Sequence, residues 1–118
     1  MHTVMVADDN QFMRKRISKV LAENGYKVIE AENGDQATSL YRSTKPDVTL
    51  LDVVMPDKDG LEALAEIRRL DSQAKVIMLT ALDQQGVALK AVQLGAKDFL
   101  AKPVPPDRLV TTLQKVLG

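Results

Sequence analysis

Five short apolar runs, separated by segments of helical periodicity, are the feature that most restricts the fold of this chain. The runs are Val4–Ala7, Val28–Ala31, Val48–Leu51, Val76–Leu79 and Asp98–Ala101. They lack the strict alternation with polar residues that a half-exposed strand shows, which indicates strands covered on both faces. We therefore predict that these runs are strands of a buried parallel sheet.

Four of the segments that follow these runs carry apolar residues at helical spacing. The four groups are Met13, Ile17, Val20 and Leu21; Leu61, Leu64 and Ile67; Leu89 and Val92; and Leu109, Leu113, Val116 and Leu117. Gly25 stands where a helix C-cap glycine belongs, and Pro106 suits a first helical position. A weaker pattern over Gln36–Arg42 predicts a short second helix. This alternation predicts an α/β fold of the (βα)5 type, in which a five-stranded, doubly wound parallel sheet has helices on both faces.

Composition excludes several classes of protein. The length of 118 residues suits one domain, spanning residues 1–118, and only four residues are Phe or Tyr, which predicts an aliphatic core. Sixteen basic and 16 acidic residues give zero formal net charge, which argues against a nucleic-acid-binding domain. The absence of cysteine and the single histidine exclude disulfides, thiol catalysis and multi-histidine metal sites. Without a membrane-length apolar run or a signal peptide, we expect a monomeric cytoplasmic protein that binds no membrane.

Polar and charged residues follow the carboxyl ends of four of the predicted strands. Asp8 and Asp9 follow the first run, Asp52 the third, Thr80 the fourth and Lys102 the fifth. Ligands of open parallel sheets bind at this edge, so we expect these five residues to meet there. Each residue alone also has a structural interpretation, since aspartate caps helices, threonine suits strands and lysine is usually solvated. Asp52 is the hardest to explain structurally, because a carboxylate beside a buried sheet is costly unless it is compensated.

The predicted cluster has a specific chemistry. Three carboxylates brought together repel, so that one of them must take up a proton or a cation must bind. Oxygen ligands without cysteine or histidine suit a hard cation, and Mg²⁺ is the usual choice where phosphate is involved. A carboxylate beside Mg²⁺, an ammonium and a hydroxyl has the groups needed for phosphoryl transfer to the carboxylate.

With these residues in place, the sequence resembles the receiver domain of bacterial two-component response regulators. The matching residues are Asp8-Asp9, Asp52, Met55-Pro56-Asp57-Lys58-Asp59-Gly60, Thr80-Ala81 and Lys102-Pro103. The resemblance covers essentially the whole chain. Within the family, the segments Phe12–Arg14 and Gly95–Phe99 are most similar to stand-alone, chemotaxis-type receivers. The resemblance implies a flavodoxin-like sheet with strand order 2-1-3-4-5.

The resemblance also implies roles for individual residues at the metal and acceptor site. Asp52 would be the phosphoacceptor, and Asp9 and Asp52 would bind Mg²⁺ directly. The main-chain carbonyl of Val54 would be a further ligand, and Asp8 would contribute through water. Lys102 would pair with the phosphoryl group.

The remaining implications concern signalling. Thr80 would hydrogen-bond the phosphoryl group, Phe99 stands at the family's aromatic switch position, and the Lys102–Pro103 peptide would be cis. A sensor histidine kinase would supply the phosphoryl group, and an unidentified downstream protein would bind the face around Phe99. The chain would be a signalling switch of a phosphorelay and not an enzyme, since it would catalyse only its own phosphorylation and dephosphorylation.

Four other interpretations are open at this point. A haloacid-dehalogenase-type phosphatase needs a second aspartate two residues after its nucleophile, and Val54 stands there. A flavodoxin needs a loop rich in Ser, Thr and Gly after the first strand, where Asp8-Asp9-Asn10 would repel phosphate. A receiver that docks without phosphorylation does not require the full set of reactive residues. A receiver cut from a larger regulator with a separate output domain would look the same.

Overall fold

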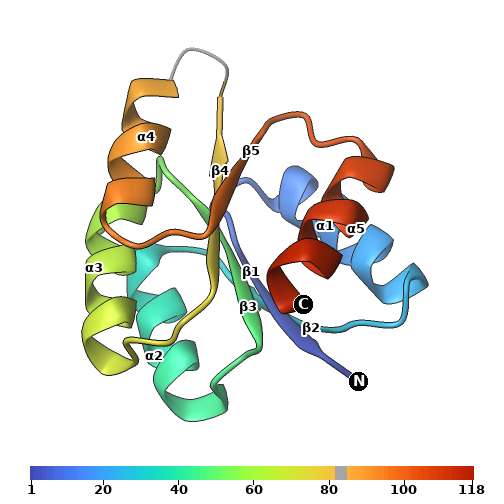
Figure 1. The fold of residues 1–118 in the computed structure, drawn as a ribbon, viewed down its shortest axis with the longest axis horizontal. Coiled ribbons are helices and arrows are strands. Elements are labelled where there is room, and N and C mark those ends of the chain that lie inside the picture. The colour runs from blue at the N-terminus through green and yellow to red at the C-terminus, as the bar shows by residue number, and fades with distance from the viewer. Residues whose placement is uncertain (82–84) are drawn as a thin grey trace.

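The computed structural model describes residues 1–81 and 85–118, and it confirms the predicted α/β fold (Figure 1). Five strands form one parallel sheet, and their bounds are Thr3–Ala7 (β1), Lys27–Ala31 (β2), Val48–Asp52 (β3), Val76–Thr80 (β4) and Asp98–Ala101 (β5). The strand order is β2-β1-β3-β4-β5, as the family resemblance implied. Val4 pairs with Val28 on one side and with Val48 on the other, so β1 lies inside the sheet.

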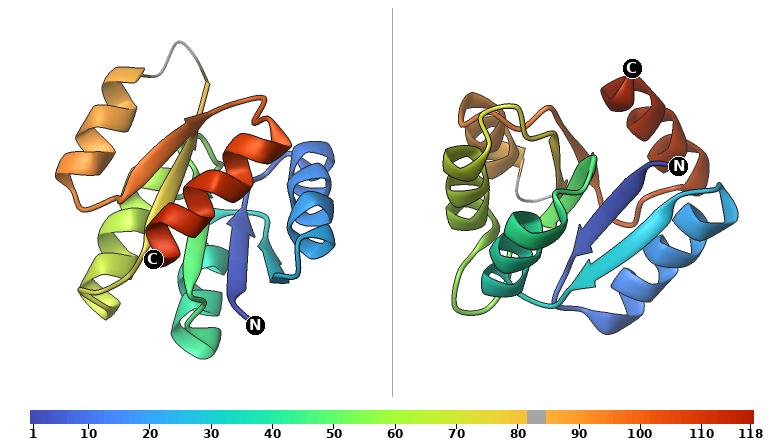
Figure 2. Two further views of the ribbon diagram at one scale, coloured as in Figure 1. Left: turned by 45° about the vertical axis from the view of Figure 1, so that its right-hand side comes forward. Right: turned by 90° about the horizontal axis from the view of Figure 1, so that it is seen from below.

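Helices cover both faces of the sheet. Their bounds are Gln11–Glu23 (α1), Gly34–Thr44 (α2), Gly60–Leu70 (α3), Gln85–Gln93 (α4) and Pro106–Leu117 (α5). The views in Figures 1 and 2 place α1 and α5 on one face and α2, α3 and α4 on the other. No helix within the described residues is long and apolar enough to cross a membrane.

The strands divide their side chains between two apolar cores. Val4 and Val6 of β1 pack with Ile17 of α1, while Met5 and Ala7 pack in the core under α2, α3 and α4. Successive side chains of a strand point to opposite faces, so a strand buried on both sides must be apolar throughout. This explains why the five runs show no alternation with polar residues.

The second helix is longer than predicted. It covers Gly34–Thr44, whereas the apolar pattern indicated only Gln36–Arg42. The Asn33 side chain accepts a hydrogen bond from the Gln36 backbone N–H at 2.8 Å, which caps a helix that begins before the first apolar position. At the other end, Lys45 adopts a left-handed conformation with φ of 46° and ends the helix.

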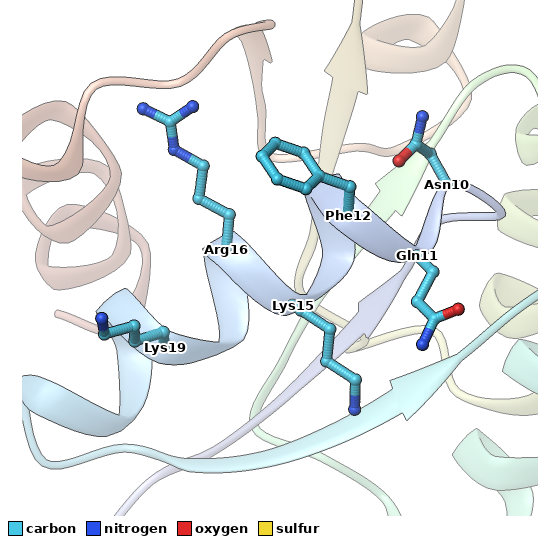
Figure 3. A pocket seen from close by; sticks show the side chains of 6 residues that line it. All are labelled: Asn10, Gln11, Phe12, Lys15, Arg16 and Lys19. Atoms are coloured by element: carbon cyan, nitrogen blue, oxygen red, sulfur yellow. The ribbon is translucent and has the colours of Figure 1, made fainter.

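The prediction of an aliphatic core is wrong for one aromatic residue. Tyr41 is buried in the core under α2 and α3, and its hydroxyl donates to the Asp71 carboxylate at 2.9 Å. The ring fills apolar space while its polar end reaches a partner, which is the usual arrangement of a buried tyrosine. Phe12, by contrast, lies exposed on the outer side of α1 beside a depression that Lys15, Arg16 and Lys19 also line (Figure 3).

The loop after β3 folds back closely onto the end of that strand. The Gly60 N–H donates to the Val53 carbonyl at 2.8 Å, and the Asp59 side chain caps α3 by accepting from the Glu62 N–H. A Cβ atom on Gly60 would lie 2.7 Å from the Cα of Val53 and would overlap the carbonyl oxygen of Asp52. Only glycine fits here without moving the backbone, because both contacts are with main-chain atoms.

We expect Gly60→Ala to lower the free energy of unfolding by about 1–3 kcal/mol, the usual cost of overpacking. Gly86→Ala is the matched control, because a Cβ at Gly86 meets no atom within 4 Å. That variant should be neutral, or more stable by up to about 1 kcal/mol, since alanine favours helix over glycine. Urea unfolding of both variants measures the difference, and equal stabilities would contradict the close approach at Gly60.

Candidate functional site

The residues predicted at the carboxyl edge of the sheet come from four neighbouring strands. Asp52 and Thr80 are the last residues of β3 and β4, whereas the apolar runs ended one residue earlier. The ladder extends because Asp52 pairs with Leu79 and Thr80 with Ala101. These side chains are therefore positioned by the sheet itself.

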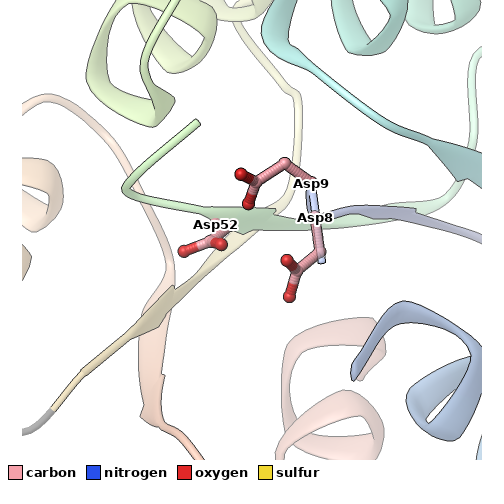
Figure 4. Close-up of side chains that lie close together, drawn as sticks. All are labelled: Asp8, Asp9 and Asp52. Atoms are coloured by element: carbon pink, nitrogen blue, oxygen red, sulfur yellow. The ribbon is translucent and has the colours of Figure 1, made fainter. Parts of the chain in front are cut away.

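Asp8, Asp9 and Asp52 form a cluster of carboxylates (Figure 4). One carboxylate oxygen from each residue lies within 4.8 Å of the others. Asp8 is fully buried and Asp52 is nearly so, while Asp9 is exposed at the surface. The Asp8 N–H donates to the Ala31 carbonyl, which continues the pairing of β1 with β2 up to the cluster. Oxygen atoms at these distances are a donor set that fits a hard divalent cation.

Lys102 supplies the opposite charge. Its Nζ donates to Asp52 Oδ2 at 2.9 Å and lies 3.4 Å from Asp8 Oδ2. Lys102 follows β5, and its N–H donates to the Thr80 carbonyl at 2.7 Å, which holds it beside the end of β4. The Lys102–Pro103 peptide is cis, as the resemblance implied. The interpretation of Lys102 as a solvated lysine is wrong, because its side chain is 20% exposed and ion-paired.

Burial and neighbouring charges set the electrostatics of the pair. Burial raises the pKa of the Asp52 carboxyl to about 6; the hydrogen bond from Lys102 opposes that rise and the Asp8 charge adds to it. Burial acts to lower the pKa of Lys102, but the hydrogen bond and charge of Asp52, with those of Asp8, outweigh it and raise that pKa. The ammonium therefore stays charged, while the carboxylates carry an excess of negative charge.

Thr80 and Val54 adjoin this cluster, while Phe99 lies farther back on β5, paired with Met78. The Thr80 side chain is buried, and its hydroxyl donates to the Ala81 carbonyl at 3.1 Å instead of to a carboxylate. Phe99 is partly buried on β5, against the core under α2, α3 and α4. Val54 exposes 55% of its surface, and its N–H donates to Asp52 Oδ1 at 3.3 Å. Its carbonyl accepts no hydrogen bond from the residues that the structure describes, which leaves that oxygen free for a cation.

Sequence reasoning missed two charged side chains that hold the loops of the site. Arg14 is 5% exposed on α1, donates to the Asp8 carbonyl and pairs with Glu30 of β2. Lys58 pairs with Asp35 of α2 at 2.9 Å and with Glu66 of α3 at 2.5 Å, which ties the loop after β3 to both helices. The available signal for Arg14 was its position on the apolar face of α1, shared with Ile17.

Comparisons with known proteins place this chain in a family. The model of the response regulator receiver domain family matches residues 4–114. The chemotaxis protein CheY of Bacillus subtilis is 44% identical over 118 residues, which cover 99% of this chain and 98% of that protein. A probable transcriptional regulator, ycf27 of Guillardia theta, is 38% identical, and the match covers 97% of this chain but 44% of the longer relative. The crystal structure of the receiver domain of NtrX from Brucella abortus superposes with a TM-score of 0.93 at 28% identity, covering 97% of each chain.

A five-stranded parallel sheet with three carboxylates and a lysine at its carboxyl edge defines a receiver domain. The chain belongs to the response regulator receiver family and is similar to CheY chemotaxis proteins over nearly its full length. It is therefore a switch of two-component signalling and not a catalytic enzyme, and a histidine kinase is implied as its phosphodonor. Family membership disfavours the phosphatase and flavodoxin interpretations.

The two neighbours of Asp52 are expected to move its pKa in opposite directions. In the metal-free protein, Lys102→Met should raise the pKa above about 6, because the hydrogen bond that favours the carboxylate is lost. Asp8→Asn should lower it, because a repelling negative charge is removed. Titration of the Asp52 carboxyl carbon by NMR measures both shifts, and shifts of the same sign would contradict this arrangement.

Proposed function

We propose that Asp52 accepts a phosphoryl group from a histidine kinase and that the resulting acyl phosphate changes the partner-binding face of the protein. The observation that carries this assignment is the contact of 2.9 Å between Asp52 Oδ2 and Lys102 Nζ at the end of β3. Asp8 Oδ2 lies farther from this Nζ, at 3.4 Å, and Asp8 Oδ1 accepts from the Asn10 N–H at 2.9 Å. Asp52 is therefore better placed than Asp8 to combine a reactive carboxylate with a neighbouring cation.

In this reaction the chain's own groups would act as nucleophile and electrostatic stabilisers. An oxygen of Asp52 forms the bond to phosphorus while the bond from phosphorus to the donor's histidine nitrogen breaks, and the electron pair leaves with the imidazole. The Lys102 ammonium offsets negative charge on the phosphoryl oxygens. The Thr80 hydroxyl, at the end of the adjacent strand, donates a hydrogen bond to one of them after leaving the Ala81 carbonyl.

The carboxylate cluster and the neighbouring carbonyl oxygen also fit a Mg²⁺ ion. Asp9 and Asp52 would bind it directly together with the Val54 carbonyl oxygen, and Asp8 would act through water. The excess of carboxylates over the Lys102 ammonium favours a cation, and the purely oxygen donor set favours a hard one. When bound, the ion supplies Lewis-acid stabilisation of the charge on the transferred group.

The downstream partner would bind the face formed by α4, β5 and α5. Engagement of the phosphoryl group by Thr80 empties space beside β5 into which the partly buried ring of Phe99 can turn. Exposed polar residues on this face are Lys90, Gln93, Lys97 and Arg108. Leu89 and Val92 of α4 are also exposed, so the face has apolar as well as polar contacts to offer. Phosphorylation would thus bias a two-state surface.

The assignment of Asp52 is tested by incubation with acetyl phosphate and Mg²⁺ followed by intact-mass measurement. We expect an adduct of about 80 Da, the mass of HPO₃, on the wild type. Asp52→Asn should show none, because its amide is not a nucleophile. Chelation of the metal should suppress the adduct on the wild type. An adduct that persists in Asp52→Asn would disprove the assignment.

The switch is tested with beryllofluoride, an analogue of the phosphoryl group, by NMR. Amide shifts should change on α4, β5 and α5, and the ring signals of Phe99 should move. In Thr80→Ala the analogue should still bind at Asp52, while the response at Phe99 is lost because the hydroxyl that couples them is gone. Shift changes confined to the loop around Asp52 in the wild type would contradict the proposed face.

A further inference from the structure

Arg14 is a buried cation on the apolar side of α1. It is 5% exposed and lies on the helix face that also buries Ile17 and Leu21. A guanidinium at such a position requires partners for its charge and its N–H groups. The proposed chemistry at Asp52 does not use Arg14, so its contacts call for a separate explanation.

Those contacts join two strands at the edge of the acidic cluster. Nη1 donates to the Asp8 carbonyl oxygen at 2.7 Å, in a bond that is fully buried. Nε donates to Glu30 Oε1 at 2.8 Å, and Nη2 lies 3.7 Å from Glu32 Oε1. Burial acts to raise the pKa of Glu30, but the hydrogen bonds from Lys15 and Arg14 outweigh it and lower that pKa, so Glu30 remains a charged anchor. The planar guanidinium is thereby fixed at both ends.

The bond to Asp8 acts on the backbone between two members of the cluster. The Asp8 carbonyl and the Asp9 N–H belong to one planar peptide unit, so fixing the oxygen fixes the orientation of the whole plane. That plane sets the direction in which each side chain leaves the main chain. Asp8 points inward toward Lys102, and Asp9 reaches the surface, yet their oxygens and that of Asp52 remain within 4.8 Å.

We infer that Arg14 is a positioning residue for cation binding, which holds the Asp8–Asp9 peptide so that both carboxylates face one ion. The inference rests on the proposed function, since it assumes a divalent cation at this cluster. Arg14 itself contacts neither the cation nor the phosphoryl group. Residues of this kind orient the ligands of a metal. Their loss typically lowers metal affinity by about 10- to 100-fold.

A matched pair of variants separates positioning from charge. Arg14→Met and Lys15→Met each remove one positive charge from adjacent positions of α1 and one ion pair with Glu30. Only the first removes the hydrogen bond to the Asp8 carbonyl. Loss of a nearby cation should by itself strengthen Mg²⁺ binding, whereas loss of positioning should weaken it. The two explanations therefore predict changes of opposite sign for Arg14→Met.

The experiment is a titration of the full chain with MgCl₂, followed by the amide shifts of Asp9 and Asp52. We expect the dissociation constant for Mg²⁺ to rise about tenfold in Arg14→Met. In Lys15→Met it should stay unchanged or fall slightly. A urea unfolding curve in EDTA accompanies each titration, because a merely structural role would lower stability without changing the dissociation constant of the folded protein. An unchanged or tighter dissociation constant in folded Arg14→Met overturns the inference.

Should Arg14→Met fail to fold, Arg14→Lys carries the same test. Lysine keeps the charge but is a single ammonium that cannot bridge Glu30 and the Asp8 carbonyl as the guanidinium fork does. We expect weaker Mg²⁺ binding in this variant too, and wild-type affinity would overturn the inference. If Mg²⁺ fails to shift the amides of Asp9 and Asp52 in the wild type, the proposed metal site falls together with the inference. If the wild type binds Mg²⁺ and both Arg14 variants bind it equally well, only the inference falls.

Discussion

The site depends on the pairing of buried carboxylates with the single ammonium of Lys102. Asp8 and Asp52 are almost completely withdrawn from water, and Lys102 lies within 3.4 Å of both. One ammonium cannot balance them together with Asp9, and burial, with the Asp8 charge, raises the pKa of Asp52 to about 6 despite the hydrogen bond from Lys102. Placing uncompensated charge at the end of a buried strand costs stability in the free protein. The same excess of negative charge favours the binding of a cation. A cation that binds only the folded state then stabilises that state.

Several close contacts keep this charge cluster in one arrangement. The sheet places Asp52 and Thr80 at the ends of paired strands. Gly60 lets the loop between β3 and α3 return closely onto the end of β3. Lys58 then links that loop to Asp35 and Glu66 on two helices. Ion pairs near the surface contribute little to stability by themselves, and Asp35 is largely exposed, so the contribution of Lys58 is to join two helices to one loop. The loop after β3 is therefore held from both sides, which suits a site whose side chains come from separate segments.

The sequence was sufficient to predict the strands, the helical layers on both faces of the sheet and the polar groups at its carboxyl edge. Two-sided burial makes a strand apolar throughout, so the runs were visible without any partner being known. The strand order and the cis Lys102–Pro103 peptide came from family resemblance, and the structure agrees with both. The length of α2 was missed because a capping side chain, Asn33, lies outside the apolar pattern. Tyr41 lies in the predicted second helix, but its hydrogen bond to Asp71 could not be foreseen, because that partner is 30 residues away in the sequence.

The interactions that the sequence did not reveal are those of Arg14 and Lys58, in which a charged side chain contacts the backbone or another helix. Lys102 and Arg14 are both cations beside Asp8, yet one faces the carboxylate and the other faces the peptide carbonyl. The first offsets charge that would otherwise repel, and its effect follows from Coulomb attraction. The second orients the Asp8–Asp9 peptide. In our inference Arg14 thereby strengthens cation binding, whereas its positive charge alone would weaken it. Counting charges near an acidic cluster therefore cannot rank these residues; the atom to which each cation donates decides what it does.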